Sequence, residues 1–299
     1  MESIELAIDI GGTKTLVSAF IEGSQEPLAS KEFPTFPECG ADDFLARLRS
    51  VCEGLTGSGQ ISRWGLCTAG AVDPDTGTLV WSPNLGWKNL KLFERLIPFL
   101  GTEGVIENDC NAAAFGEWAI RKDIHSLIYV TVSTGIGMGI VFGGDIFRGA
   151  NGVAGEIGHT VVDPNGPLCT CGRHGCLQAL SGGKGLEKIV KDSLNREIKT
   201  KEIIDRAKMN ERFFSELVTR ASRTLGRFLC NLIDSFDPEL LVIGGNLGKN
   251  PFYFSSIERT IRDNHYQIHG KNFEVELSVA EPSPTILGTL LLSRKLKTH

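Results

Sequence analysis

The stretch Ile4-Glu-Leu-Ala-Ile-Asp-Ile-Gly-Gly-Thr-Lys-Thr-Leu-Val-Ser-Ala-Phe20 places two apolar runs on either side of a Gly-Gly turn. Short apolar and β-branched runs joined by such a turn predict a β-hairpin. Asp9 stands out, because a carboxylate near the end of a buried strand normally needs a partner or a cation. Gly11, Gly12 and Thr13 offer backbone N–H groups and a hydroxyl to phosphate oxygens, although an ordinary turn explains the same residues.

The same outline returns in the middle of the chain. Ser126 to Val132 is an apolar run, Ser133 to Gly139 is a Gly-rich polar turn, and Ile140 to Phe142 is apolar again. A third Gly-rich turn, Gly244 to Gly248, follows the buried-strand run Glu239 to Ile243, at the strand end where ligands bind in α/β sheets. The repeated strand–turn–strand unit predicts two related domains that face each other across a cleft.

Between the second and third turns lies a compact Gly-rich run, Gly152 to Gln178, with one histidine and three cysteines in the order His159, Cys169, Cys171, Cys176. An imidazole and three thiolates complete a tetrahedral shell for zinc and leave no open position for catalysis. His174 competes for the fourth position, so spacing leaves the choice of histidine open. The alternative is four unrelated loop residues, but so short a loop has few apolar side chains to hold it in place. We therefore expect a structural zinc site.

Further helices and strands follow from apolar spacing. Three-to-four spacing predicts helices over residues 41–55, 186–194 and 213–236 and a last helix over 286–296, and β-type runs cover 64–67, 104–107 and 273–279. Asn108 and Asp109 stand where the strand 104–107 passes into a predicted helix over 111–122. A polar pair at that place is either a helix cap or a pair of site residues.

Composition excludes several classes of protein. At 299 residues and 41% hydrophobic the chain is long enough for two domains, and a net charge of −5 gives no general attraction to nucleic acid or anionic membrane. The apolar stretch Leu127 to Phe142 is broken by polar residues and glycines, so it predicts no membrane span. The acidic start leads directly into a strand pattern and predicts no secretory segment, and the eight cysteines read as buried thiols and metal ligands. We expect a cytoplasmic protein.

Six motifs in this order resemble the ROK family (repressors, open reading frames and sugar kinases) of the actin-like, hexokinase-like ATPases, and the resemblance covers almost the whole chain. The motifs are Asp9-Ile-Gly-Gly-Thr-Lys14, Glu107-Asn-Asp-Cys-Asn-Ala-Ala-Ala-Phe-Gly-Glu117, Ser133-Thr-Gly-Ile-Gly137, Gly155-Glu-Ile-Gly-His159, Cys169-Thr-Cys-Gly-Arg-His-Gly-Cys176 and Val242-Ile-Gly-Gly245.

The resemblance implies an α/β fold of two actin-like (ribonuclease H-like) domains with an interdomain active-site cleft that binds a sugar and ATP. Family layouts place a small domain at residues 1–108 and a large domain, with the zinc-binding loop, at 109–284. The final helix, about 285–299, would pack back on the small domain. Homodimers or homotetramers are expected.

The resemblance also assigns roles to single residues. Asp109 matches the catalytic base, and the sugar-binding positions are Gly70, Asn84, Asn108, Asp109, Glu156, His159 and Gln178. The nucleotide-binding positions are Gly11, Gly12, Thr13, Lys14, Thr134, Gly135, Gly244 and Gly245. Asp9 matches the carboxylate that holds the Mg²⁺ of Mg-ATP. The zinc ligands are His159, Cys169, Cys171 and Cys176, and the second nitrogen of His159 would donate to a sugar hydroxyl.

The sequence departs from the family pattern in three places. Gln178 stands where family kinases usually have a glutamate that reaches the sugar; the amide keeps its length but loses the charge and gains a donor. Met138 replaces a common glycine in the second turn, and Thr68-Ala69 replaces a Pro-Gly start before Gly70. The first departure bears on which sugar is bound more than on the type of reaction.

Taken together, the residues predict an ATP-dependent hexose kinase, with glucose as the first choice because Ser82-Pro-Asn-Leu-Gly-Trp87 and the Gly155–His159 motif look most like glucokinase-type members. Fructokinase, mannokinase and N-acetylhexosamine kinase are the alternatives. A regulator of the same family would carry a helix-turn-helix before the first hairpin, where this chain has only eight residues before Asp9. A non-catalytic sugar sensor is disfavoured by Asp109, and a nucleic-acid zinc knuckle by the lack of basic and aromatic neighbours.

Overall fold

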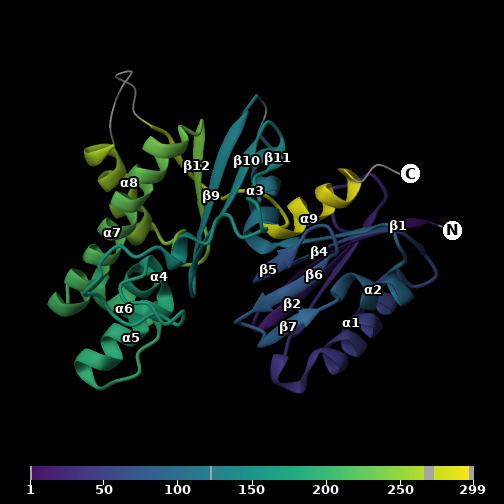
Figure 1. Cartoon of the computed structure of the whole chain (residues 1–299), viewed down its shortest axis with the longest axis horizontal. Coiled ribbons are helices and arrows are strands. Elements are labelled where there is room, and N and C mark those ends of the chain that lie inside the picture. The colour runs from purple at the N-terminus through teal and green to yellow at the C-terminus, as the bar shows by residue number, and fades with distance from the viewer. Residues whose placement is uncertain (1, 122, 266–272, 296–299) are drawn as a thin grey trace. The chain divides into compact units, whose positions relative to one another are not determined.

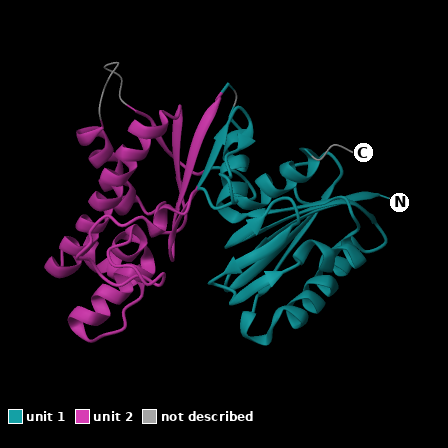
Figure 2. Ribbon diagram, viewed as in Figure 1, with its two compact units in different colours: residues 1–123, 139–154, 279–299 teal, residues 124–138, 155–278 magenta. Residues whose placement is uncertain are grey.

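The computed structural model describes residues 2–121, 123–265 and 273–295. Its contacts divide the chain into two compact units, shown in Figure 2. Unit 1 comprises Met1–Asp123, Gly139–Ala154 and Val279–His299, and unit 2 comprises Ile124–Met138 and Gly155–Ser278. The predicted domain bounds, 1–108 and 109–284, stay a prediction, and residues 296–299 of the predicted last helix lie outside the described residues. The fold is α/β, as predicted.

Unit 1 is built on a five-stranded sheet of order β3-β2-β1-β4-β8. Its strands are β1 (Ser3–Ile10), β2 (Lys14–Ile21), β3 (Ala29–Pro34), β4 (Gln60–Thr68) and β8 (Gly104–Asn108). β1 and β2 form the predicted antiparallel hairpin, while β1–β4 and β4–β8 pair in parallel. The register places Asp9 beside Cys67 and Cys67 beside Glu107. Parallel pairing therefore brings three polar or ionisable side chains to the same end of the sheet.

Helices cover both faces of this sheet because its strands are apolar on both sides (Figure 1). α1 (Ala41–Thr56) and α2 (Leu92–Leu100) pack on one face in the main core, with residues such as Leu6 and Ile8 of β1. On the other face Ala7 and Phe20 pack against Ile286 and Leu290 of α9 (Pro284–Lys295).

α3 (Asp109–Ala119) follows β8 and packs closely on α9. A β-carbon on Gly288 of α9 would lie 1.7 Å from the carbonyl oxygen of Ala112, so the two backbones touch at a point that only glycine allows. A short sheet of order β5-β6-β7, with β5 (Ala71–Asp73), β6 (Thr78–Ser82) and β7 (Trp87–Leu90), and the 3₁₀ turn η1 (Pro37–Cys39) complete the first part of unit 1. This small sheet was not predicted from the sequence.

Unit 2 centres on three parallel strands, with β12 (Leu240–Gly244) paired to β9 (Ser126–Val132) and to β13 (Val275–Leu277). Its helices are α4 (Leu177–Ser181), α5 (Gly183–Leu194), α6 (Thr200–Lys208), α7 (Arg212–Phe236) and α8 (Pro251–Asn264), and η2 (Ile157–His159) is a single 3₁₀ turn. α7 packs against α8, α6 and α4.

The second Gly-rich turn separates β9 from β10 (Ile136–Phe142), a strand that begins in unit 2 and ends in unit 1, where it pairs with β11 (Asp145–Ile146). The helices predicted over 186–194 and 213–236 are present with small shifts at their starts, whereas α2, α6 and α8 were missed. None of the helices within the described ranges is long and apolar enough to cross a membrane.

Candidate active site and metal-binding loop

Asp9 lies near the end of β1 in unit 1 and is half-buried. Its Oδ2 accepts a hydrogen bond from the Thr285 hydroxyl at 2.6 Å, and the Cys67 thiol is a second partner. Burial raises the pKa of Asp9, and these hydrogen bonds offset that shift only in part. A hard cation held by carboxylate and hydroxyl oxygens would favour the ionised form, so the donor set at Asp9 fits Mg²⁺.

Asn108 and Asp109 stand at the junction of β8 and α3, and Asn108 is the N-cap of the helix. The Asn108 Oδ1 accepts from the backbone N–H of Cys110 at 2.8 Å and of Asn111 at 3.1 Å, and its Nδ2 donates to the Gly70 carbonyl at 3.0 Å. The Asp109 Oδ1 accepts from the Cys110 N–H at 2.9 Å. Both side chains are half-buried. The N-terminus of α3 therefore sets the direction of the Asp109 side chain.

Glu107, which the sequence reading left without a role, fixes this junction from behind. Its buried carboxylate accepts from the Asn108 N–H at 2.9 Å and from the Asn111 side-chain amide at 3.0 Å. Arg148 donates to the other oxygen through Nε at 2.8 Å and approaches it with Nη2 at 2.7 Å. The Glu107 carboxylate is buried while Arg148 is half-buried, and four donors converge on the two carboxylate oxygens, which fixes the direction of the carboxylate. A glutamate directly before the Asn-Asp pair was the signal available in the sequence.

The first Gly-rich turn is held by the Gly11 N–H to the Lys14 carbonyl at 3.0 Å and by the Thr35 hydroxyl to the Gly11 carbonyl at 2.7 Å. Asn84 lies beside it, because a β-carbon on Gly12 would be 3.1 Å from that of Asn84. Thr13 and Asn84 are exposed. The Lys14 ammonium forms an exposed ion pair with Glu32 at 2.6 Å.

In unit 2 the second and third turns border a cavity of about 510 Å³. Its lining includes Ser133, Thr134, Lys184, Glu187, Thr200 and Asn246. Of the predicted nucleotide positions, Thr134 lines it directly, while Gly135, Gly244 and Gly245 belong to the bordering turns. Glu187 was missed by the sequence reading; its carboxylate accepts from both the N–H and the hydroxyl of Thr200 at 3.0 Å. Sequence periodicity gives no signal for this contact, because Glu187 lies on α5 and Thr200 at the start of α6.

The four predicted zinc ligands come together in unit 2. Their ligand atoms all lie within 4.8 Å of one another, with His159 Nδ1 3.7 Å from Cys169 Sγ and Cys171 Sγ 3.5 Å from Cys176 Sγ. Zinc bonds of 2.0–2.3 Å in a tetrahedron place neighbouring donor atoms about 3.7 Å apart, so the group fits zinc. His174 lies outside the group, with its Nδ1 3.1 Å from the Gly166 carbonyl. Of the two histidines that spacing left open, His159 is the one that lies with the three cysteines.

The loop around these ligands is shaped by tight turns. Gly175 has φ +65°, and a β-carbon there would lie 1.4 Å from the Asp163 carbonyl oxygen, so no other residue fits. Burial acts to raise the pKa of Cys171, but hydrogen bonds from the backbone and side chain of Arg173 outweigh it and lower the pKa to about 6. A thiol that ionises this readily is prepared to serve as a metal ligand.

Glu156 and Gln178 flank the ligand group differently. Glu156 caps η2 and is exposed to solvent. Gln178, on α4, donates through Nε2 to Cys169 Sγ at 3.5 Å and to the Thr170 hydroxyl at 3.4 Å. Its Oε1 faces the second turn, 3.0–3.1 Å from where β-carbons on Gly158 and Gly135 would lie. The amide therefore lies between Cys169 and the second turn.

Comparison with known proteins identifies relatives along the whole length. The sequence matches the ROK family over residues 5–295. N-acetylmannosamine kinase from Escherichia coli O9:H4 (strain HS) is 32% identical over 268 residues, covering 88% of this chain and 90% of that protein. The ROK hexokinase from Thermus thermophilus superposes with a TM-score of 0.84 at 30% identity, covering 96% of this chain and 97% of that one.

A ROK family glucokinase from Streptomyces griseus, solved with glucose and AMPPNP, gives a TM-score of 0.80 at 25% identity and covers 98% of this chain and 100% of that one. These neighbours share the two-domain actin-like ATPase fold, which is therefore the fold of this protein. The predicted resemblance is confirmed: the chain belongs to the ROK family.

Proposed function

We propose that this ROK-family sugar kinase transfers the γ-phosphoryl group of ATP to a hexose, at the 6-hydroxyl. The main support is the β8–α3 junction, where Asn108 caps the helix and Asp109 is oriented by its N-terminus. The hydroxyl proton passes to the Asp109 carboxylate as the alkoxide oxygen bonds to the γ-phosphorus and the bond to ADP breaks. A carboxylate is a weak base for an alcohol, so Asp109 accepts the proton late and mainly orients the oxygen.

Unit 2 supplies the nucleotide-binding half of the proposal. The cavity bordered by Thr134 and Asn246 is of a size that suits the adenosine part of ATP, and Glu187 and Thr200 offer polar groups to a ribose or base. In unit 1, Gly11, Gly12 and Thr13 are assigned to the phosphates. Asp9 would hold the Mg²⁺ of Mg-ATP, which neutralises charge on the phosphate oxygens.

The metal loop is assigned to the sugar. Zinc held by His159, Cys169, Cys171 and Cys176 would be structural, since four protein ligands fill its shell. The Nδ1 of His159 faces the ligand group, which leaves Nε2 as a donor for a sugar hydroxyl. Glu156, three residues earlier and exposed, is the second sugar contact that we assign here.

Two acceptors come first. The Ser82–Trp87 motif favours glucose, and a glucokinase of similar fold has been solved with glucose. N-acetylmannosamine is supported by relatives named N-acetylmannosamine kinases at 32–33% identity. The two sugars differ at carbon 2 in both the substituent and its orientation. A site that selects one of these sugars must therefore form hydrogen bonds with its carbon-2 substituent and exclude the carbon-2 substituent of the other.

Initial rates of ADP formation with Mg-ATP and glucose, N-acetylmannosamine, N-acetylglucosamine, mannose and fructose test the proposal. We expect one sugar to dominate kcat/KM, and the parallel run with Asp109→Asn to lose turnover. Folded, zinc-loaded protein that consumes no ATP with any of these sugars would refute a kinase function. Sedimentation of the same sample tests the expected homodimer or homotetramer.

A further inference from the structure

Helix α7 carries a run of positive charge that the kinase proposal leaves without a role. The segment 217–233 contains three arginines, Arg220, Arg223 and Arg227, and no acidic residue, in a chain whose net charge is −5. Steps of three and four residues place the three on one face of the helix. Like charges one turn apart repel. The one acidic residue that lines the same face, Glu216, is paired with Arg212.

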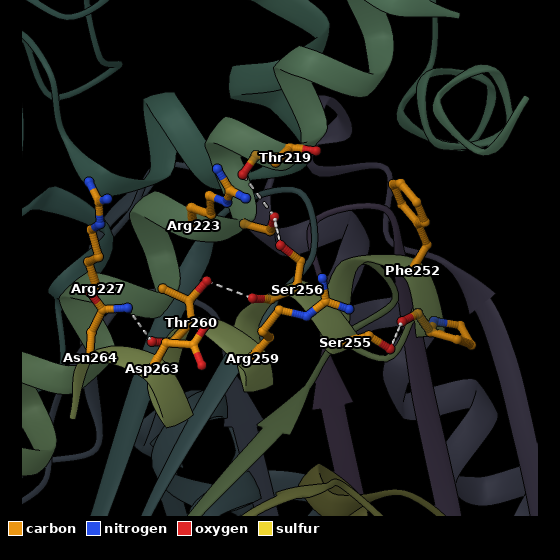
Figure 3. A pocket seen from close by; sticks show the side chains of 12 residues that line it. Thr219, Arg223, Arg227, Phe252, Ser255, Ser256, Arg259, Thr260, Asp263 and Asn264 are labelled. Atoms are coloured by element: carbon orange, nitrogen blue, oxygen red, sulfur yellow. Dashed lines mark hydrogen bonds between the residues drawn. The ribbon is translucent and has the colours of Figure 1, made fainter. Parts of the chain in front are cut away.

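Arg223 and Arg227 line a cavity of about 680 Å³ between α7 and α8, and Arg259 of α8 lines it from the other side (Figure 3). All three side chains are exposed. No carboxylate among the described residues forms an ion pair with any of them. Two other arginines on the same helices are paired.

Those pairs are Arg212 with Glu216 at 2.8 Å and Arg262 with Glu258 at 3.5 Å. A carboxylate one turn away therefore pairs with each of these two arginines, whereas Arg259, one turn from Asp263, forms no such ion pair within the described residues. Asp263 is the single carboxylate that lines the cavity, against three guanidinium groups, so the cavity carries a net positive charge.

The remaining lining groups are hydroxyls. Ser222 donates to the Ser256 hydroxyl at 2.7 Å, Thr260 donates to the Ser256 carbonyl at 2.7 Å, and Thr219 and Ser255 stand at the edges (Figure 3). Hydroxyls can donate to phosphate oxygens, and the guanidinium fork matches them bidentately. Phe252, exposed at the start of α8, adds an apolar surface.

We propose that the α7–α8 cavity binds a small anion that carries phosphate groups, such as a phosphate ester or a pyrophosphate. A hollow with cationic walls from two helices and hydroxyl side chains suits a compact anion better than a flat macromolecular surface. Its lining residues do not overlap with those of the cavity bordered by Thr134. The site is therefore separate from the one assigned to ATP and lies within unit 2.

Calorimetric titration of the zinc-loaded protein with inorganic pyrophosphate and, separately, with glucose 6-phosphate, at constant ionic strength, tests the site. Arg223→Ala combined with Arg259→Ala should weaken binding of the anion about a hundredfold, since each of the two lost charged contacts is worth about 1.5 kcal/mol, or roughly a factor of ten. Arg212→Ala, an exposed arginine of α7 that is paired with Glu216, is the matched control and should bind as the parent does. Stronger binding of glucose 6-phosphate than of pyrophosphate would assign the site to a sugar ester, and the reverse order to free phosphates.

Charge-preserving Arg223→Lys keeps the fold and the charge but loses the fork, so an intermediate affinity is expected. Identical titrations for the parent and the double alanine variant would overturn the proposal, because the anion would then occupy the nucleotide turns alone. A change in the particle mass of the double variant without any loss of pyrophosphate affinity would also overturn it, in favour of an interface with a second copy of the chain.

Discussion

The polar end of the unit 1 sheet and the metal loop of unit 2 hold their functional side chains by different means. In unit 1, strand register sets Asp9 beside Cys67, and a helix N-terminus with an ion pair to the buried Glu107 sets Asp109. In unit 2, the residues around His159 are ordered by turns and by four side chains that converge on one point.

The difference lies in what each region has buried beneath it. The unit 1 strands share a continuous apolar core with α1 and α2. The buried cluster of the metal loop consists of Cys169, Cys176 and Ala179, with Cys171 packed against it. Three of these four are proposed metal ligands, so the loop has almost no hydrophobic stabilisation of its own. Unit 1 should keep its site geometry without a metal, and the loop should lose it.

The largest effect is expected where the geometry is most rigid. Asp109→Asn removes the proton acceptor but keeps the size of the side chain and an oxygen for the Cys110 N–H. We expect kcat to fall about 10²–10⁴-fold with little change in the affinities for ATP and sugar. Single-turnover kinetics measure the loss of the chemical step, and calorimetry measures the affinities for ATP and sugar. Asp192→Asn, an exposed aspartate paired with Lys188, is the matched control, and turnover near that of the parent in Asp109→Asn would contradict the assignment.

Loss of the metal should act on one region only. Cys171→Ser, or treatment with a chelator, should raise the KM for sugar about 10–100-fold, the range seen when metal surroundings are disturbed, and change the KM for ATP far less. Cys39→Ser is the control. The sequence predicts a buried thiol at Cys39, and that prediction is wrong: Cys39 is an exposed free cysteine of unit 1, at the end of the short turn η1. Equal losses for both substrates would show that the loop supports the whole fold, and the contrast between the regions would fail.

Asp9 tests the rigid region through stability. Its pKa is raised in the folded protein, chiefly by burial, so its stabilising contribution is fully present below the unfolded value near 3.8 and is lost as the pH rises through the folded pKa. At neutral pH without Mg-ATP, Asp9→Asn should therefore raise Tm. Each kcal/mol gained in the free energy of unfolding should raise Tm by about 2–4 °C. The gain should vanish in acid, and the same variant should lose Mg-ATP turnover. A lower Tm at pH 7 would mean that the charge is already compensated.

Prediction from sequence succeeded where chain order alone encodes the geometry. The β1–β2 hairpin, a polar pair at the start of α3 and a group of one histidine with three cysteines were predictable from local spacing. The choice between His159 and His174 was not, because it depends on turns that point one ring inward and the other at Gly166. The partnership of Glu107 with Arg148, 41 residues apart, and the Glu187 side of the nucleotide cavity depend on tertiary packing that periodicity does not carry.

Substitution of Gln178 gives the smallest expected effect, and it tests a residue that contacts both the metal loop and the second Gly-rich turn. Its Nε2 donates to the Cys169 sulfur, and its Oε1 faces the second turn. Gln178→Glu restores the residue usual in the family: the carboxylate cannot donate to Cys169, but it makes a stronger, charge-assisted bond to a sugar hydroxyl. We therefore expect faster zinc loss to a chelator together with a KM for sugar that falls a few-fold. Gln178→Leu removes the donor without adding charge, so it should show the faster zinc loss without the gain for sugar. If KM is unchanged in Gln178→Glu while zinc loss quickens in both variants, Gln178 serves only the metal loop, and sugar selectivity rests on Glu156 and His159.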